Sequence, residues 1–392
     1  MPDRRIAGID VLRGLAVLLV VIHHIQLRFV LEHCSVEGLL PHALERVLFQ
    51  SGYYSVLAFL VISGFLITRR SLQRWGRLGR IPLTDFYRMR AARILPCLLL
   101  LLVVLSLLHI AGAQGFTIRP ERSTLPRALL AALTFHVNWL EGHRGYLPGN
   151  WDVLWSLSIE EAFYIVFPLA CVLLRRERWV VLCLAALLVA GPLNRQALSG
   201  QEPWNDYAYL SCADALAYGC LAAWISTRAT FTRNTLRALL CVGLAAVLLI
   251  AVFRTFTFNL GLTETGLDAS VLELGVACML TAFAGHVGNV SLARGTGWLR
   301  RIGQWSYEIY LTHMFVVMTL VRAYKAMFGP APASAFVYPI AFVVMLGLSL
   351  ALGGGVARWI SEPANAALRR QRLPAQAPAA VRVMGPGDEP QR

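Results

Sequence analysis

Long apolar segments alternate with short, arginine-rich polar segments along the chain. A helix needs roughly 20 apolar residues to cross the hydrocarbon of a bilayer, which is about 30 Å thick. The pattern therefore predicts an all-α, polytopic integral membrane protein with about ten transmembrane helices, at residues 11–31, 53–68, 94–113, 154–174, 179–193, 208–226, 236–253, 269–287, 304–325 and 335–356.

Three segments need a separate interpretation. The stretch 125–141 is apolar, but counting it as a span would invert every later loop, so we expect a re-entrant or interfacial helix there. Residues 1–372 are predicted to form one transmembrane domain, and 373–392, rich in Pro, Ala and charge, a disordered cytoplasmic tail. No small-residue cleavage site follows the first apolar segment, so we interpret it as an uncleaved span.

Composition and charge support the membrane interpretation. Hydrophobic residues make up 57% of the chain and charged residues only 15%, whereas soluble domains carry about 25% charged residues. The net charge is +14, and arginines gather in every second connection and in the tail, with loop 114–150 as the exception. The positive-inside rule then places both termini in the cytoplasm, and this placement argues against nucleic-acid binding. The eight cysteines form no C-x-x-C pair, so neither a metal site nor a disulfide framework is predicted.

The first predicted span, GIDVLRGLAVLLVVIHH, contains Arg13 and His24. Their separation of eleven residues is about 1100° of rotation, so they share one helix face, about 16 Å apart. Ionisable residues inside a span are costly and by default mark a functional cavity. Arg13 has the alternative of reaching back to the cytoplasmic interface, and His24 that of a neutral, structural imidazole.

Three other segments carry candidate chemistry. In FYRMRAARILP, Arg90 and Arg93 are three residues apart and offer paired guanidinium groups to a phosphate, although ordinary positive-inside topology is an alternative. WSLSIEEAFYIVFP places Glu160 and Glu161 inside an apolar helix, either paired with arginines or lining a cavity. SYEIYLTH forms a polar stripe that suits sugar recognition, with aromatic packing as the commoner meaning; it contains Tyr307, Tyr310 and His313.

Together these segments, with FLVISGFLI and RWISEP, resemble the acyltransferase-3 family, the integral-membrane acyltransferases of bacteria and animals. The six motifs occur in family order between residues 8 and 363. The resemblance implies that His24 is the catalytic base beside Arg13, that Arg90 and Arg93 form the R-x-x-R motif linked to the acyl-CoA donor, and that Glu160 is the glutamate of W-S-L-x-x-E. It also implies a bacterial inner membrane location.

The chain departs from the family pattern in two places. Val153 and Leu154 stand where many members have His-Thr, which leaves any helper histidine there in doubt. Some bacterial members carry an extra C-terminal hydrolase-like domain, which the sequence does not show, so we expect a stand-alone transmembrane enzyme.

These observations predict an O-acyltransferase, most simply an O-acetyltransferase, with acetyl-CoA as a substrate and no permanently bound cofactor or metal. The acceptor is expected to be a hydroxyl of an envelope saccharide or a similar molecule. Direct transfer is favoured, and an acyl-histidine intermediate stays open. We expect the donor phosphates to bind at Arg90 and Arg93, together with Arg69 and Arg70. The predicted catalytic groups are His24, Arg13 and Glu160. The predicted acceptor-binding residues are Tyr164, Tyr307, Tyr310 and His313.

Two rival functions remain. A membrane transporter or flippase of a saccharide or lipid-linked substrate would also carry polar residues inside its spans, but it more often shows inverted repeats and broken helices, which the sequence does not display. A membrane scaffold would not need Arg13, His24 and the two glutamates within the bilayer. The expected partners are acyl-CoA, the hydroxyl acceptor and lipid, and no oligomeric state is predicted.

Overall fold

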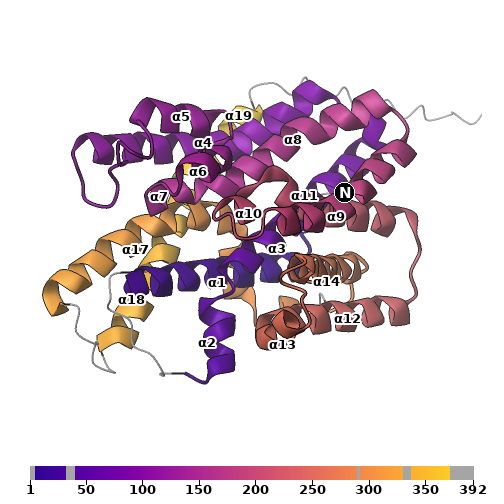
Figure 1. The fold of residues 1–392 in the computed structure, drawn as a ribbon. Helices are drawn as coiled ribbons and strands as arrows, with labels where there is room; N and C mark the ends of the chain where they lie inside the picture. The colour runs from indigo at the N-terminus through magenta and orange to yellow at the C-terminus, as the bar shows by residue number, and fades with distance from the viewer. Residues whose placement is uncertain (1–4, 32–39, 289–291, 330–336, 371–392) are drawn as a thin grey trace, which may run out of the picture.

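The computed structural model describes residues 5–31, 40–288, 292–329 and 337–370, and this part of the chain is helical (Figure 1). The predicted tail at 373–392 lies outside the described residues. The elements are α1 Ala7–Leu31, α2 His42–Phe49, α3 Gly52–Trp75, the 3₁₀ helix η1 Leu78–Arg80, α4 Leu83–Ile110, α5 Leu125–Leu133, α6 Val137–Arg144, α7 Gly149–Asp152, α8 Leu154–Leu174, α9 Glu177–Ala197, α10 Trp204–Tyr207, α11 Tyr209–Arg228, α12 Arg233–Val252, α13 Arg254–Asn259, α14 Leu267–Ala284, α16 Gly297–Gln304, α17 Ser306–Phe328, α18 Val337–Val356, the π-helical turn η2 Ala357–Ser361 and α19 Glu362–Arg370.

The predicted multi-pass membrane architecture is confirmed. Each of the ten predicted spans coincides with one long helix: α1, α3, α4, α8, α9, α11, α12, α14, α17 and α18. Within the described residues, nine of these are long and apolar enough to cross a membrane. The tenth, α17, has 23 residues, but Glu308, Arg322 and Lys325 make it more polar than the others.

The arginine-rich connections meet at one end of the bundle. The η1 segment between α3 and α4 reaches the start of α9, where the Leu78 backbone N–H donates to Glu177 Oε1 at 3.3 Å. Arg228 at the end of α11 donates to the same carboxylate at 2.6 Å. At the other end of the bundle, Arg46 of α2 donates to Thr255 of α13 at 2.9 Å. The connections therefore alternate between two ends, as the predicted topology requires.

The buried centre of the bundle is formed by α3, α11 and α14, whereas α12 is mostly exposed and runs along one edge (Figure 1). Small residues bring α3 and α11 into backbone contact: a Cβ on Gly64 would lie 2.1 Å from the Leu216 carbonyl oxygen, and one on Gly219 would lie 2.0 Å from that of Val61. Gly64 and Gly219 therefore allow the backbones of α3 and α11 to approach closely.

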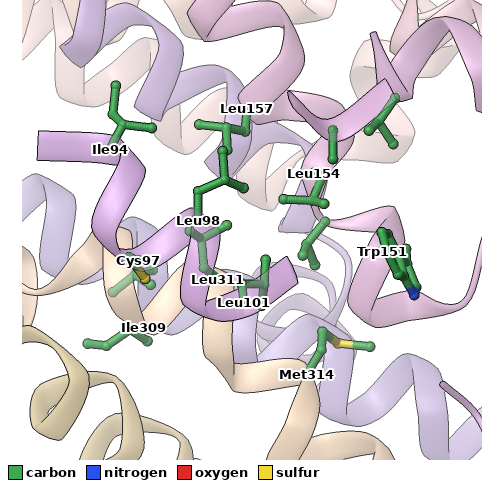
Figure 2. Packing of buried hydrophobic residues seen from close by; sticks show 14 of the residues in the cluster. Ile94, Cys97, Leu98, Leu101, Trp151, Leu154, Leu157, Ile309, Leu311 and Met314 are labelled. Carbon is green, nitrogen blue, oxygen red and sulfur yellow. The ribbon is translucent and has the colours of Figure 1, made fainter. Parts of the chain in front are cut away.

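A second apolar cluster joins α4, α8 and α17. Leu98 and Leu101 of α4, Leu157 of α8 and Leu311 of α17 belong to it and are all buried (Figure 2). Because α4 carries Arg90 and Arg93 and α17 carries His313, this packing fixes the position of the arginine pair relative to the histidine.

The segment predicted as re-entrant or interfacial, 125–141, forms α5 and the first part of α6. The two helices have nine and eight residues. At about 1.5 Å per residue, neither reaches half the thickness of the hydrocarbon layer. Neither helix is a full span, which agrees with the prediction.

Gly64→Ala is expected to lower the free energy of unfolding by about 1–3 kcal/mol, because the added methyl group must displace the backbone of α11. The matched control is Gly347→Ala in α18, where a Cβ would meet nothing within 4 Å. Thermal denaturation in detergent measures both variants. Equal transition temperatures for the two would contradict the proposed backbone contact.

Candidate active site

His24 of α1 lies against His313 of α17. Nδ1 of His24 is 3.1 Å from Nε2 of His313 and 3.0 Å from the Val20 carbonyl oxygen. Nδ1 of His313 faces two carbonyl oxygens of its own helix, those of Tyr310 at 2.7 Å and Ile309 at 3.2 Å. The His313 side chain is fully buried and that of His24 partly so.

This geometry assigns the tautomers of both rings when they are neutral. A carbonyl oxygen only accepts hydrogen bonds, so Nδ1 of His313 carries its proton and Nε2 is an acceptor. Nδ1 of His24 then faces two acceptors and must carry its own proton. Nε2 of His24 is left with the lone pair, which is what a general base needs.

Arg13 also contacts α17, as its shared helix face with His24 predicts. Its guanidinium donates to the hydroxyl of Ser306 at 2.9 Å. Ser306 and His313 are seven residues apart, about 10 Å along α17. Arg13 therefore lies two turns of α17 away from the histidine pair, where Arg70 and Arg93 also come within electrostatic range.

Arg90 of α4 is held by side chains of α8. Its guanidinium is 3.8 Å from Oε1 of Glu160 and stacks on the Tyr164 ring, 3.5 Å from the ring centre. The same carboxylate oxygen accepts from the hydroxyl of Ser63 of α3 at 2.5 Å and from that of Tyr164. Glu160 was expected either to pair with an arginine or to line a cavity, and these contacts favour the pairing with Arg90.

Arg93, one turn along α4, has an equivalent set of partners on α17. Its guanidinium is 3.4 Å from Oε1 of Glu308, and it lies 5.5 Å from the centre of the Tyr307 ring. Each arginine of the pair is thus accompanied by one carboxylate and one tyrosine. Because Glu308 and His313 are both on α17, five residues apart, the arginine pair and the histidine pair are joined by about 7.5 Å of one helix.

The remaining predicted residues are two arginines and four predicted acceptor-binding residues. Of the arginines, Arg69 stacks loosely on Phe65, 6.0 Å from its ring centre, and Arg70 faces Arg13. The hydroxyl of Tyr310 is 2.7 Å from that of Ser156, and its ring centre is 6.0 Å from that of His313. Tyr310 and His313 therefore adjoin His24, whereas Tyr164 and Tyr307 adjoin the arginine pair. The predicted acceptor-binding role of all four stays a prediction.

The side chain of His23, the neighbour of His24, lies in a different environment. Its Nδ1 lies 2.5 Å from the Phe49 carbonyl oxygen, and its ring packs against Gly52. Of the two neighbouring histidines, only His24, which shares a helix face with Arg13, contacts an imidazole of α17.

Two important acidic positions were missed in the sequence analysis. Glu308 lies next to Tyr307 inside the recognised motif SYEIYLTH, and its place in an otherwise apolar segment was a usable signal.

Glu273 of α14 belongs to a second buried charge cluster, which is centred on Arg195 of α9. Arg195 donates to both carboxylate oxygens of Asp214 of α11, at 2.9 and 2.7 Å. Glu273 lies 3.9 Å from the same guanidinium. Single charged residues inside apolar spans indicated this cluster, but the sequence does not show which of them pair.

The comparison with family models decides the family. The model described as "Acyltransferase domain" matches residues 6–354. The chain belongs to this acyltransferase-3 family. This confirms the resemblance drawn from the six motifs.

Relatives in the acyltransferase-3 family include O-acetyltransferase OatA of Staphylococcus aureus (strain NCTC 8325 / PS 47), which is 23% identical over 368 residues, or 88% of this chain and 55% of that protein. The protein SACOL0978 of Staphylococcus aureus (strain COL) is 30% identical over 179 residues, or 44% of this chain and 25% of that protein. The chain thus spans about half the length of OatA. No solved structure matches the chain.

Arg195→Met is expected to destabilise the protein by about 3–5 kcal/mol, because it leaves the buried carboxyl groups of Asp214 and Glu273 without their cation. The matched control is Arg228→Met, which breaks an exposed pair with Glu177 and should cost at most about 1 kcal/mol. Chemical denaturation in detergent followed by tryptophan fluorescence measures both. Similar losses in the two variants would contradict a structural role for the buried cluster.

Proposed function

We propose that the protein transfers an acyl group, most simply acetyl, from cytoplasmic acyl-CoA to a hydroxyl group of an envelope saccharide or a similar acceptor. The observation that carries the proposal is the arrangement on α17: the arginine pair adjoins its first turn, and the His24–His313 contact follows about one and a half turns later. This geometry offers a phosphate-binding group and a general base at two levels of one helix.

The donor site of the proposal is built around Arg90 and Arg93. Two guanidinium groups suit the pyrophosphate of CoA, because each presents a rigid fork of donors. Glu160 and Glu308 orient the forks, and Arg69, Arg70 and Arg13 add positive charge on the same side. The acyl-pantetheine arm then extends along α17 toward His24.

The chemical step uses the lone pair on Nε2 of His24. This nitrogen removes the proton of the acceptor hydroxyl as its oxygen attacks the thioester carbonyl carbon. The carbon–sulfur bond then breaks, and the CoA thiolate takes the proton back from the imidazolium, which yields CoA and the O-acyl ester. His313 acts as a positioning residue, because its Nε2 holds the proton of His24 on Nδ1.

The orientation in the membrane follows from the same site. The connections rich in arginine meet at one end of the bundle, and we assign this end to the cytoplasm of a bacterial inner membrane under the positive-inside rule. Asp10, near the start of α1, lies at the same end, because it accepts a hydrogen bond from Gln304. Arg369 of α19 also lies there, because it faces Arg70 and Arg74. Acyl-CoA therefore enters from the cytoplasm and the acceptor from the opposite side.

Replacing Arg90 and Arg93 together by alanine is expected to weaken CoA binding about 100-fold, and replacing both by lysine about 10-fold, because lysine keeps the charge but loses the bidentate fork. The matched control is the double variant Arg233→Ala with Arg237→Ala, which removes the same charge from exposed positions of α12. Calorimetric titration of the purified protein with CoA provides the affinities. Unchanged affinity in the alanine variant would remove the pair from the donor site.

His24→Ala is expected to reduce acetyl transfer by about 10²–10⁴-fold without changing CoA affinity, because the general base is lost and the phosphate site is intact. Purified protein with labelled acetyl-CoA and a panel of glycans measures the transfer. His23→Asn serves as the control and should keep most of the activity, since its imidazole contacts a backbone carbonyl away from His313. Normal transfer by the His24 variant would rule out this residue as the base.

A further inference from the structure

The short helix α7 lies at the end of α1 that follows His24. A Cβ on Gly149 would be 2.4 Å from a terminal nitrogen of Arg28 and 2.5 Å from the methyl group of Met314. Arg28 is one helical turn after His24, and Met314 follows His313 directly. α7 therefore covers the histidine pair on the side opposite the arginine pair, where the proposed acceptor must arrive.

The side chains of this region include buried polar groups that no described residue satisfies. Asn150 is 1% exposed, yet neither its amide nitrogen nor its amide oxygen has a hydrogen-bond partner among the described residues. The same holds for Nε1 of the fully buried Trp151. Figure 2 shows the indole nitrogen of Trp151 directed away from the labelled leucines. Buried polar groups are almost always paired, so this concentration indicates a site that takes a polar ligand.

Two neighbouring carboxyl groups complete the region. Glu141 faces Asp152, and burial together with this neighbouring carboxylate raises the pKa of Glu141 well above its ordinary value. Burial therefore favours the protonated form of Glu141, which is able to donate a hydrogen bond. Asp152 accepts from the hydroxyl of Tyr207 at 2.8 Å and faces Arg28, so it is the acceptor of the pair.

An aromatic wall connects this region to the histidine pair. The ring of Tyr207 stacks on that of Trp155, with ring centres 4.2 Å apart and planes 8° apart. The next residue of α8 is Ser156, whose hydroxyl is 2.7 Å from that of Tyr310, and Tyr310 adjoins His313. The stacked rings and the Ser156–Tyr310 contact thus link Asp152 to the histidine pair.

We propose that α6, α7 and the start of α8 form the acceptor subsite, in which Glu141, Asn150 and Asp152 bind the hydroxyl groups of an uncharged saccharide unit. Sugar hydroxyls both donate and accept, which matches a pair of carboxyl groups and one amide. An anionic group would meet the Asp152 carboxylate, so the unit beside His24 is neutral. This inference rests on the proposed acyltransferase function and assigns its acceptor side to residues outside the recognised motifs.

The test is binding of saccharides without turnover. Purified protein in nanodiscs, saturated with CoA, is mixed with tetrasaccharides of glucose, mannose and N-acetylglucosamine, and affinity is measured by saturation-transfer NMR. We expect at least one tetrasaccharide to bind, and Glu141→Gln and Asn150→Leu to weaken its binding about 10-fold or more. Asn150→Asp, which keeps the size of the side chain, should also weaken it.

The matched control is Glu273→Gln on α14, which changes an equally buried glutamate that belongs to the Arg195 cluster and should leave saccharide binding unchanged. CoA affinity should stay at the wild-type value in all four variants, which also reports that they are folded. Unchanged saccharide affinity in the α6 and α7 variants, an equal loss in the control, or no binding of any tetrasaccharide to CoA-bound wild-type protein would overturn the inference. Failure of the wild-type protein to bind CoA would instead overturn the proposed function.

Discussion

A buried charge in a membrane bundle must find its partner on another helix, and the architecture of this protein depends on that constraint. Removing an ion from water costs several kcal/mol, which only a close partner of opposite charge offsets. Arg90 meets Glu160 of α8, Arg93 meets Glu308 of α17, and Arg195 meets Asp214 of α11. These pairs join helices that hydrophobic contact alone would leave free to slide, since lipid is as apolar as a leucine side chain.

The same constraint explains how the site is held. The two arginines of α4 are fixed from two sides, by α8 and by α17, so their guanidinium groups keep a defined separation. α17 then carries the fixed register from Glu308 to His313, and His313 determines which nitrogen of His24 bears the proton. A change at the arginine end is therefore transmitted to the histidine end through one rigid helix.

The spans, their order and the candidate residues could be predicted because each depends on local sequence. Ten apolar segments gave ten helices, and the spacing of Arg13 and His24 placed both against α17. The pairing of charges could not be predicted in this way. Glu308 and Arg93 are far apart in the chain, and the sequence does not state which faces of α4 and α17 meet. The polar residues of the loop helices α6 and α7 could not be selected for a similar reason. In the sequence they look like ordinary loop residues, and only the structure shows that they are buried.

We infer that His24 is a neutral base whose proton is held on Nδ1 by His313 and the Val20 carbonyl oxygen. ¹⁵N NMR of histidine-labelled protein tests it most directly, with the His24 signals assigned from the difference spectrum of His24→Asn. We expect neutral His24 to show a protonated Nδ1 and an unprotonated Nε2, and we expect His313→Ala, which leaves only the Val20 carbonyl as acceptor for Nδ1, to raise the share of the Nε2-protonated tautomer. A wild-type His24 protonated on Nε2, or a spectrum that His313→Ala leaves unchanged, would contradict it.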